Sequence, residues 1–292
     1  MDKTIQFQNS DKLHVTKQSL DTSGAKVQSF AIYVPETVHP DMQFEAALAM
    51  VDMFHEKIIK LNPEIKHVQT KEEINQLKKG EIGAILTLEG CDAIGSDIMK
   101  LKTLLRLGVS AVGLTWNYAN AVADGALEPR GGGLSVFGRE VIKLLNKQKT
   151  WVDVSHLSEN GFWDVMELAN QAYASHSNTY TLCPHPRNLR DDQIKALIEL
   201  NSVMGITFVP QFLSGKYTAD ITDVLRHLDY VCSLGGENHV GFGSDFDGIS
   251  TTVKGLENQK SYPNLINELL KYYSSNQVEK FLYKNMVERF PM

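Results

Sequence analysis

Short, continuously apolar runs alternate with longer amphipathic segments along this chain of 292 residues. We interpret the runs at residues 28–34, 83–90, 110–116, 150–156, 172–177, 202–209 and 239–247 as strands. A strand covered on both faces, as in a parallel sheet, is apolar throughout instead of at every second residue. The amphipathic segments at 44–61, 98–108, 136–147 and 221–235 have the period of helices. This alternation predicts βα units and a parallel sheet.

The number of strands limits which α/β fold the chain can form. An α/β barrel commonly reaches this length as one domain, so we expect a single domain over residues 1–292. Seven strands are predicted, whereas a closed (β/α)₈ barrel has eight. The first thirty residues offer only two short pieces, 5–8 and 13–16, which resemble a small hairpin or an irregular lead-in. Either the sheet is open or one strand is missing.

Composition excludes several classes of protein. The chain has 35 acidic and 29 basic residues and no run of clustered Lys and Arg, which argues against nucleic-acid binding. No apolar stretch approaches the roughly 20 residues that span a bilayer, and the N-terminus lacks the apolar core of a secretory signal. The cysteines, Cys91, Cys183 and Cys232, are odd in number and widely spaced. We therefore expect no disulfide framework, no membrane partner and a cytoplasmic location.

Ionisable residues stand at the C-terminal ends of several predicted strands. Glu89, His156 and His176 each end a strand, and Asp245 with Asp247 ends another. In a barrel these ends converge on one face, where enzymes of this architecture place their active sites. Two imidazoles and a carboxylate match the ligand preference of Zn²⁺. A metal site is therefore predicted at this face.

The competing interpretation is that these histidines are core residues, because a lone His at a strand end is more often hydrogen-bonded in the core than bound to a metal. Three such groups at successive strand ends favour the metal. By contrast, His55, His67 and His227 fall in helices or loops and are interpreted as packed or solvated. His239 precedes its strand and so stands at the wrong end for catalysis.

Two loop segments bear on substrate binding. Arg187 lies between a proline-rich turn and a helix start, where its guanidinium could bind a substrate carboxylate in a bidentate manner or pair with Asp191 or Asp192. The glycine-rich segment 115–140 could form a pocket wall. It lacks the spacing of a phosphate-binding loop, and no G-x-S-x-G elbow occurs in the chain.

Seven longer motifs together resemble the membrane dipeptidase (renal dipeptidase, M19) family of zinc peptidases, its bacterial members in particular. The motifs are TLEGCDAI (87–94), GLTWNYANAVADG (113–125), GGLSVFGREVIKLLN (132–146), VDVSHLSENGFWDVMELA (152–169), SHSNTYTLCPHPRNLRDDQI (175–194), HVGFGSDFDGI (239–249) and GLENQKSYPNL (255–265). They follow the order of the family along the chain, and the likeness as a whole covers essentially all of residues 25–290.

The resemblance implies a (β/α)₈ TIM-type barrel of the metal-dependent hydrolase type that hydrolyses dipeptides by a metal-bound hydroxide. It implies two zinc ions, with Glu89 bridging them and His156 and His176 completing the second site. It also implies that Arg187 binds the substrate carboxylate and that Asp245 handles protons and faces the substrate amine. Relatives are often homodimers.

Two departures from the family pattern alter these expectations. Trp116 stands where some members carry a His that assists the oxyanion, and Asn117 could take that role. The first strand of the family ends in H-x-D, which binds the first metal, but no H-x-D occurs before residue 30, and His14 is followed by Val and Thr. We therefore expect the chain to start after that strand, through a misassigned start codon or a cut. We also expect at most one well-bound zinc and weak or no activity.

Two alternatives to the dipeptidase remain open from the sequence. One is a related metal-dependent amidohydrolase that acts on another small amide, ester or lactam. The other is a non-catalytic binding protein derived from the same fold. A dipeptidase requires a free amine and a free carboxylate on its substrate, which distinguishes it from the amidohydrolase. Ligand binding that chelators do not affect would identify the binding protein.

Overall fold

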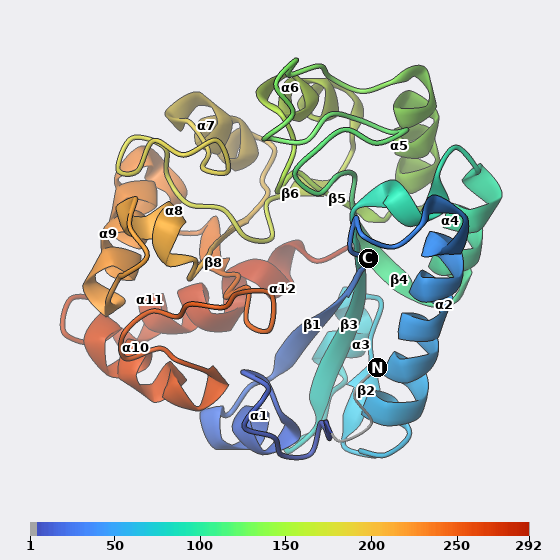
Figure 1. The fold of residues 1–292 in the computed structure, drawn as a ribbon. Helices are drawn as coiled ribbons and strands as arrows, with labels where there is room; N and C mark the ends of the chain where they lie inside the picture. The colour runs from blue at the N-terminus through green and yellow to red at the C-terminus, as the bar shows by residue number, and fades with distance from the viewer. Residues whose placement is uncertain (1–4, 292) are drawn as a thin grey trace. The chain divides into compact units, whose positions relative to one another are not determined.

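The computed structural model describes residues 5–291, which form an α/β fold (Figure 1). The chain divides into two compact units. The sheet unit comprises Val27–Ala174 together with the residues from Phe290 onward. The helix-rich unit comprises the residues up to Lys26 together with Ser175–Arg289. Each unit is described by itself.

The sheet unit contains a parallel sheet and its covering helices. Its strands are β1 (Val27–Tyr33), β2 (Ile65–His67), β3 (Ile82–Glu89), β4 (Val109–Gly113), β5 (Trp151–Asp153) and β6 (Ala172–Tyr173). Its helices are α2 (Gln43–Met53), α3 (Lys71–Asn75), α4 (Ile98–Arg106), α5 (Val136–Gln148) and α6 (Glu159–Leu168). The strand order is β1-β3-β4-β5-β6, with β2 pairing separately with β3. β1 runs alongside β3 in Figure 1 and pairs with it in parallel along its whole length.

Local sequence explains why these elements begin and end where they do. Every residue of β4 is buried, as the continuously apolar sequence predicts for a central parallel strand. Ser135 caps α5, because its hydroxyl accepts a hydrogen bond from the Gly138 backbone N–H. Gly108 separates α4 from β4 with a φ of +107°, and a Cβ at this position would lie 2.1 Å from the His67 ring. Only a glycine fits this turn, so Gly108 ends the helical segment before β4.

The helix-rich unit contains one pair of parallel strands, β7 (Met204–Ile206) and β8 (Val240–Phe242). Its helices are α1 (Lys17–Ser23), α7 (Asp191–Glu199), α8 (Pro210–Ser214), α9 (Ile221–Val231), α10 (Tyr262–Leu269), α11 (Ser275–Glu279) and α12 (Asn285–Arg289). Capping boxes start α1 at Thr16 and α9 at Asp220.

The seven predicted strands all form, although most are shorter than predicted. The sequence pattern does not predict β2, because it places residue 67 in a helix or loop. β2 has three residues and pairs with the start of β3, so it lies off the main strand path. Residues 5–16 form turns and irregular chain, which agrees with an irregular lead-in and not with a hairpin. Among the residues described, no helix combines the length and the apolar character that a bilayer span requires.

His227 on α9 is 1% exposed and is packed, as predicted. Its Nδ1 accepts a hydrogen bond from the Thr179 backbone N–H at 3.1 Å, and its Nε2 donates to the Leu213 carbonyl at 2.9 Å. Burial lowers the pKa of this imidazole below its usual range. The neutral ring therefore satisfies both backbone partners.

This burial predicts a pH dependence of stability. Because the pKa of His227 is lower in the folded state, the unfolded chain takes up the proton first as the pH falls below about 6.5. The free energy of unfolding should therefore hold above that pH and fall below it, by at most about 1.4 kcal/mol per pH unit for one group. Urea unfolding between about pH 5 and about pH 8 measures the slope. His227→Gln should reduce the slope, because it removes the buried imidazole. Equal slopes in the unmodified protein and His227→Gln would contradict the prediction.

Candidate metal centre

The candidate metal ligands and Asp245 lie at or just beyond the C-terminal ends of strands. Glu89 is the last residue of β3, where it pairs with Tyr33 of β1 and with Gly113 of β4. His156 follows the end of β5 in the same sheet unit. Since parallel strands end at the same edge, this placement brings the two side chains together.

Glu89 and His156 are in direct contact. The Glu89 Oε1 and His156 Nε2 atoms lie 3.2 Å apart, and the His156 side chain is 8% exposed. Two ligand atoms at Zn–N and Zn–O distances of about 2.0–2.2 Å and a tetrahedral angle are about 3.3–3.5 Å apart. The spacing of this imidazole and carboxylate therefore fits two ligands of one metal ion.

The other ring nitrogen of His156 contacts Asn117. The distance from His156 Nδ1 to Asn117 Oδ1 is 2.9 Å. The His156 backbone has a φ of +70°, and its carbonyl accepts from the Ala126 N–H and the Thr115 hydroxyl. The sequence suggested Asn117 as a group for the oxyanion and did not predict this contact. No local signal could have found it, because 39 residues separate the partners.

Aromatic rings border this pair. The Trp116 ring centroid lies 6.0 Å from that of His156 and 5.2 Å from that of Tyr33. Burial, together with the charges of Glu36 and Glu89, raises the pKa of Tyr33 to about 12. Tyr33 therefore stays neutral near neutral pH. Trp116, which stands where the resemblance implies an oxyanion-assisting His in some relatives, packs against the candidate metal ligand His156.

His176 and Arg187 lie together in the helix-rich unit. His176 follows β6 in sequence, is 8% exposed, and its Nδ1 lies 2.6 Å from the Ser175 hydroxyl. Arg187 is 3% exposed and donates from Nη2 to the His176 carbonyl at 3.2 Å. Its guanidinium also lies 5.5 Å from the centroid of the Phe212 ring. The arginine is thus held in place by both backbone and aromatic contacts.

The two aspartates after β8 have different surroundings. Asp245 is half-buried and adopts a φ of +61°. The Asp247 carboxylate accepts hydrogen bonds from the backbone N–H groups of His14 and Val15, at 2.6 and 3.2 Å. The His14 Nδ1 accepts in turn from the Asp247 N–H at 3.0 Å. Asp247 therefore fixes the N-terminal lead-in, a role that the sequence did not reveal.

The two aspartates that follow Arg187 in sequence, Asp191 and Asp192, have hydrogen-bond partners at the start of α7. Asp191, in the first turn of α7, accepts hydrogen bonds from the hydroxyls of Thr181 and Tyr230, both at 2.8 Å. The side chain of Asp192 accepts from the Gln193 N–H. Both carboxylates lie at a helix N-terminus, where negative charge is favourable.

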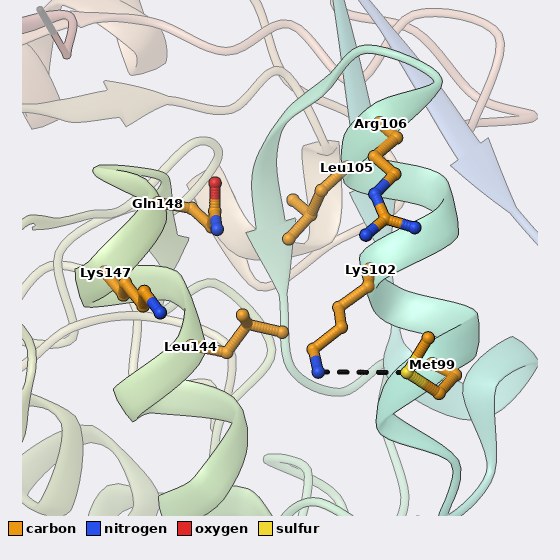
Figure 2. Close-up of a pocket in the computed structure, with 7 residues that line it drawn as sticks. All are labelled: Met99, Lys102, Leu105, Arg106, Leu144, Lys147 and Gln148. Carbon is orange, nitrogen blue, oxygen red and sulfur yellow. Dashed lines mark hydrogen bonds between the residues drawn. The ribbon is translucent and has the colours of Figure 1, made fainter.

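A cleft of about 380 Å³ lies between α4 and α5 of the sheet unit (Figure 2). Its lining residues are Met99, Lys102, Leu105, Arg106, Leu144, Lys147 and Gln148. The Lys102 ammonium lies 3.8 Å from the Met99 sulfur. None of the predicted site residues lines this cleft, so it is separate from the candidate metal centre.

Comparison with known proteins supports the metal-dependent interpretation. The model of the membrane dipeptidase family, peptidase family M19, matches residues 1–290. Dipeptidase aclJ of Aspergillus oryzae is 39% identical over 196 residues, which are 65% of this chain and 46% of that protein. This chain therefore spans about half of that relative's length.

Solved structures show the same fold. A metallopeptidase from Rhodobacter sphaeroides, liganded with a phosphinate mimic of the dipeptide L-Ala-D-Ala, matches with a TM-score of 0.91 and 26% identity over 98% of this chain and 93% of its own. Dipeptidase AC, an M19 metallopeptidase, matches with a TM-score of 0.92 and 29% identity over 98% of this chain and 92% of its own. The predicted α/β fold of the TIM-barrel type is confirmed. With its family model matching nearly every residue, the chain belongs to the membrane dipeptidase family of metallopeptidases, peptidase family M19.

Proposed function

We propose that this protein is a zinc-dependent dipeptidase that holds a zinc ion through Glu89, His156 and His176. The observation that carries the proposal is the 3.2 Å separation of the Glu89 and His156 ligand atoms in a largely buried setting. His176 is a buried imidazole, so the three side chains have the donor types that zinc prefers. Two histidines and a glutamate form a known ligand set of catalytic zinc sites, in which the fourth position stays open.

A zinc ion bound there would polarise the scissile carbonyl and lower the pKa of a water molecule. The chain's own residues would then select and orient the substrate. Arg187, buried and supported by Phe212, provides a planar pair of donors that matches a carboxylate. We assign it to the C-terminal carboxylate of a dipeptide. Asp245 is assigned to the substrate amine and to the proton that the departing nitrogen needs.

Recognition of both ends limits the substrate to a dipeptide. A longer peptide would place a neutral amide, in place of a carboxylate, beside Arg187. An N-acylated dipeptide would lack the free amine that we assign to Asp245. A relative's structure contains a phosphinate mimic of L-Ala-D-Ala, a tetrahedral analogue of amide hydrolysis. We therefore include dipeptides with a D residue at the second position among the substrates.

Chelation combined with a small substrate panel tests this proposal. The chain should hydrolyse Ala-Ala dipeptides with free termini, and it should cleave N-acetylated or C-amidated Ala-Ala much more slowly. Activity should vanish after chelation and return when zinc is added, because the ligands remain in the protein. Activity that survives complete metal removal, or equal cleavage of acetylated and free dipeptides, would contradict it.

Elemental analysis of the zinc-loaded protein tests the expected stoichiometry. A single set formed by Glu89, His156 and His176 predicts one zinc ion per chain. We also predict that a chain with one zinc ion has weak dipeptidase activity. Two tightly bound zinc ions per chain with full dipeptide turnover would contradict both.

A further inference from the structure

The side chain of Asn117 lies next to the candidate metal centre within the sheet unit. Its Oδ1 lies 2.9 Å from the Nδ1 of His156, on the side of the ring opposite the nitrogen that faces Glu89. An amide oxygen only accepts hydrogen bonds, so Nδ1 carries the proton in this contact. The Nε2 lone pair of the neutral ring then points toward Glu89.

This arrangement has a direct consequence for metal binding. A histidine binds a metal through an unprotonated nitrogen, so a ring that keeps its proton on Nδ1 presents Nε2 as a ligand. A lone pair and a carboxylate oxygen 3.2 Å apart repel each other unless a positive charge lies between them. The contact with Asn117 thus favours the ring form and orientation that a cation needs.

One short segment, residues 125–127, contacts the backbones of both Asn117 and His156. The Leu127 N–H donates to the Asn117 carbonyl at 2.8 Å, and the Ala126 N–H donates to the His156 carbonyl at 2.6 Å. Gly125 packs against the Asn117 backbone so closely that a Cβ there would lie 2.4 Å from the Asn117 carbonyl carbon. Residues 125–127 therefore hold the backbones of Asn117 and His156 in place. The contact between the two side chains is thus formed without a bound metal ion.

We propose that Asn117 is a positioning residue, which keeps the proton of His156 on Nδ1 and so orients Nε2 for the metal ion. The inference rests on the proposed function, because it requires His156 to be a metal ligand. It assigns Asn117 a role in metal affinity in place of direct contact with the substrate.

Zinc titration of the purified protein against a competing chelator tests the role, with stability measured by thermal unfolding of the metal-free forms. Asn117→Ala should weaken zinc binding about 10- to 100-fold, the usual cost of losing an outer partner of a ligating histidine. Asn117→Asp keeps an acceptor at the same position, so it should restore most of the affinity. Both variants should fold, because the Asn117 side chain is only half-buried.

His156→Ala separates the two possible failures. If His156→Ala weakens zinc binding but Asn117→Ala does not, Asn117 has no positioning role and the metal site stands. If His156→Ala leaves zinc affinity unchanged, the proposed function itself fails. A loss of affinity in Asn117→Ala that Asn117→Asp does not recover would also overturn the inference, because it would show that the acceptor oxygen is not what matters.

Nitrogen-15 spectra of the histidine rings give a second, activity-independent readout on the unmodified protein. His156 should carry a proton on Nδ1, and in the zinc-loaded form that proton should exchange with solvent faster in Asn117→Ala than in the unmodified protein. A bare Nδ1 in the unmodified protein would overturn the inference.

Discussion

Glu89→Ala should abolish zinc binding and, with it, dipeptide hydrolysis. Glu89 supplies the carboxylate oxygen 3.2 Å from His156 Nε2, so its removal takes away one of the two ligand atoms that already stand at metal-binding distance. The loss of zinc affinity should exceed the roughly 100-fold that follows from losing an outer partner of a ligand. His156→Ala should have an effect of the same size, because it removes the other ligand atom.

Zinc titration and elemental analysis of the purified variants measure this effect before any assay of activity. Glu140→Ala and His39→Ala are matched controls, since both side chains are exposed and lie outside the candidate site. Both controls should bind zinc as the unmodified protein does. Unchanged zinc affinity in Glu89→Ala would remove the central support for the metal centre.

Arg187→Ala should lower kcat/KM for dipeptides roughly 30- to 4,000-fold. Truncating one partner of a buried, hydrogen-bonded charge pair costs about 2–5 kcal/mol, and each 1.4 kcal/mol is a factor of ten. Arg187 is 3% exposed, so the charge of a bound carboxylate would be poorly screened by water at this site. Cleavage of the C-amidated dipeptide, which is slow from the start, should change little.

Three measurements make the Arg187 result specific. Arg187→Lys should recover only part of the activity, because an ammonium lacks the planar pair of donors. Arg190→Ala is the matched control, since Arg190 is exposed and stacks on Tyr180 at 4.3 Å. Zinc affinity should stay unchanged in Arg187→Ala. A parallel loss of zinc would show that Arg187 acts through its hydrogen bond to the His176 carbonyl and would contradict a role in binding the substrate.

The periodicity of the chain predicted the strands and helices well, because each depends on neighbouring residues. β3 and β4 are almost entirely buried, and this burial is what their continuous apolar sequences encode. β2 escaped prediction because its sequence Ile-Lys-His is too short and too polar to show a period. It exists because the edge of β3 offers backbone partners, which are a property of the sheet and not of residues 65–67.

At the candidate site, too, the sequence predicts which residues lie at strand ends but not every contact that they make. Glu89 and His156 were predicted as partners from their place after strands, and the structure brings them together. Asp247 was grouped with Asp245 on the same grounds, yet its carboxylate binds the backbone of residues 14 and 15. Adjacency in sequence could not separate these two roles, since a strand end only places a side chain near an edge.

The amino-acid order was therefore enough to specify an α/β chain, its family motifs and the chemical kinds of the candidate ligands, because these depend on residue type and short-range spacing. Folding alone decided which atoms meet. The contact between Asn117 and His156 joins residues 39 apart, and a backbone turn at His156 with a φ of +70° aims the ring. This contact depends on the directions of the two side chains and on the hydrogen bonds that residues 125–127 make to their backbones. No local sequence pattern predicts either of them, because both depend on segments far apart in the chain.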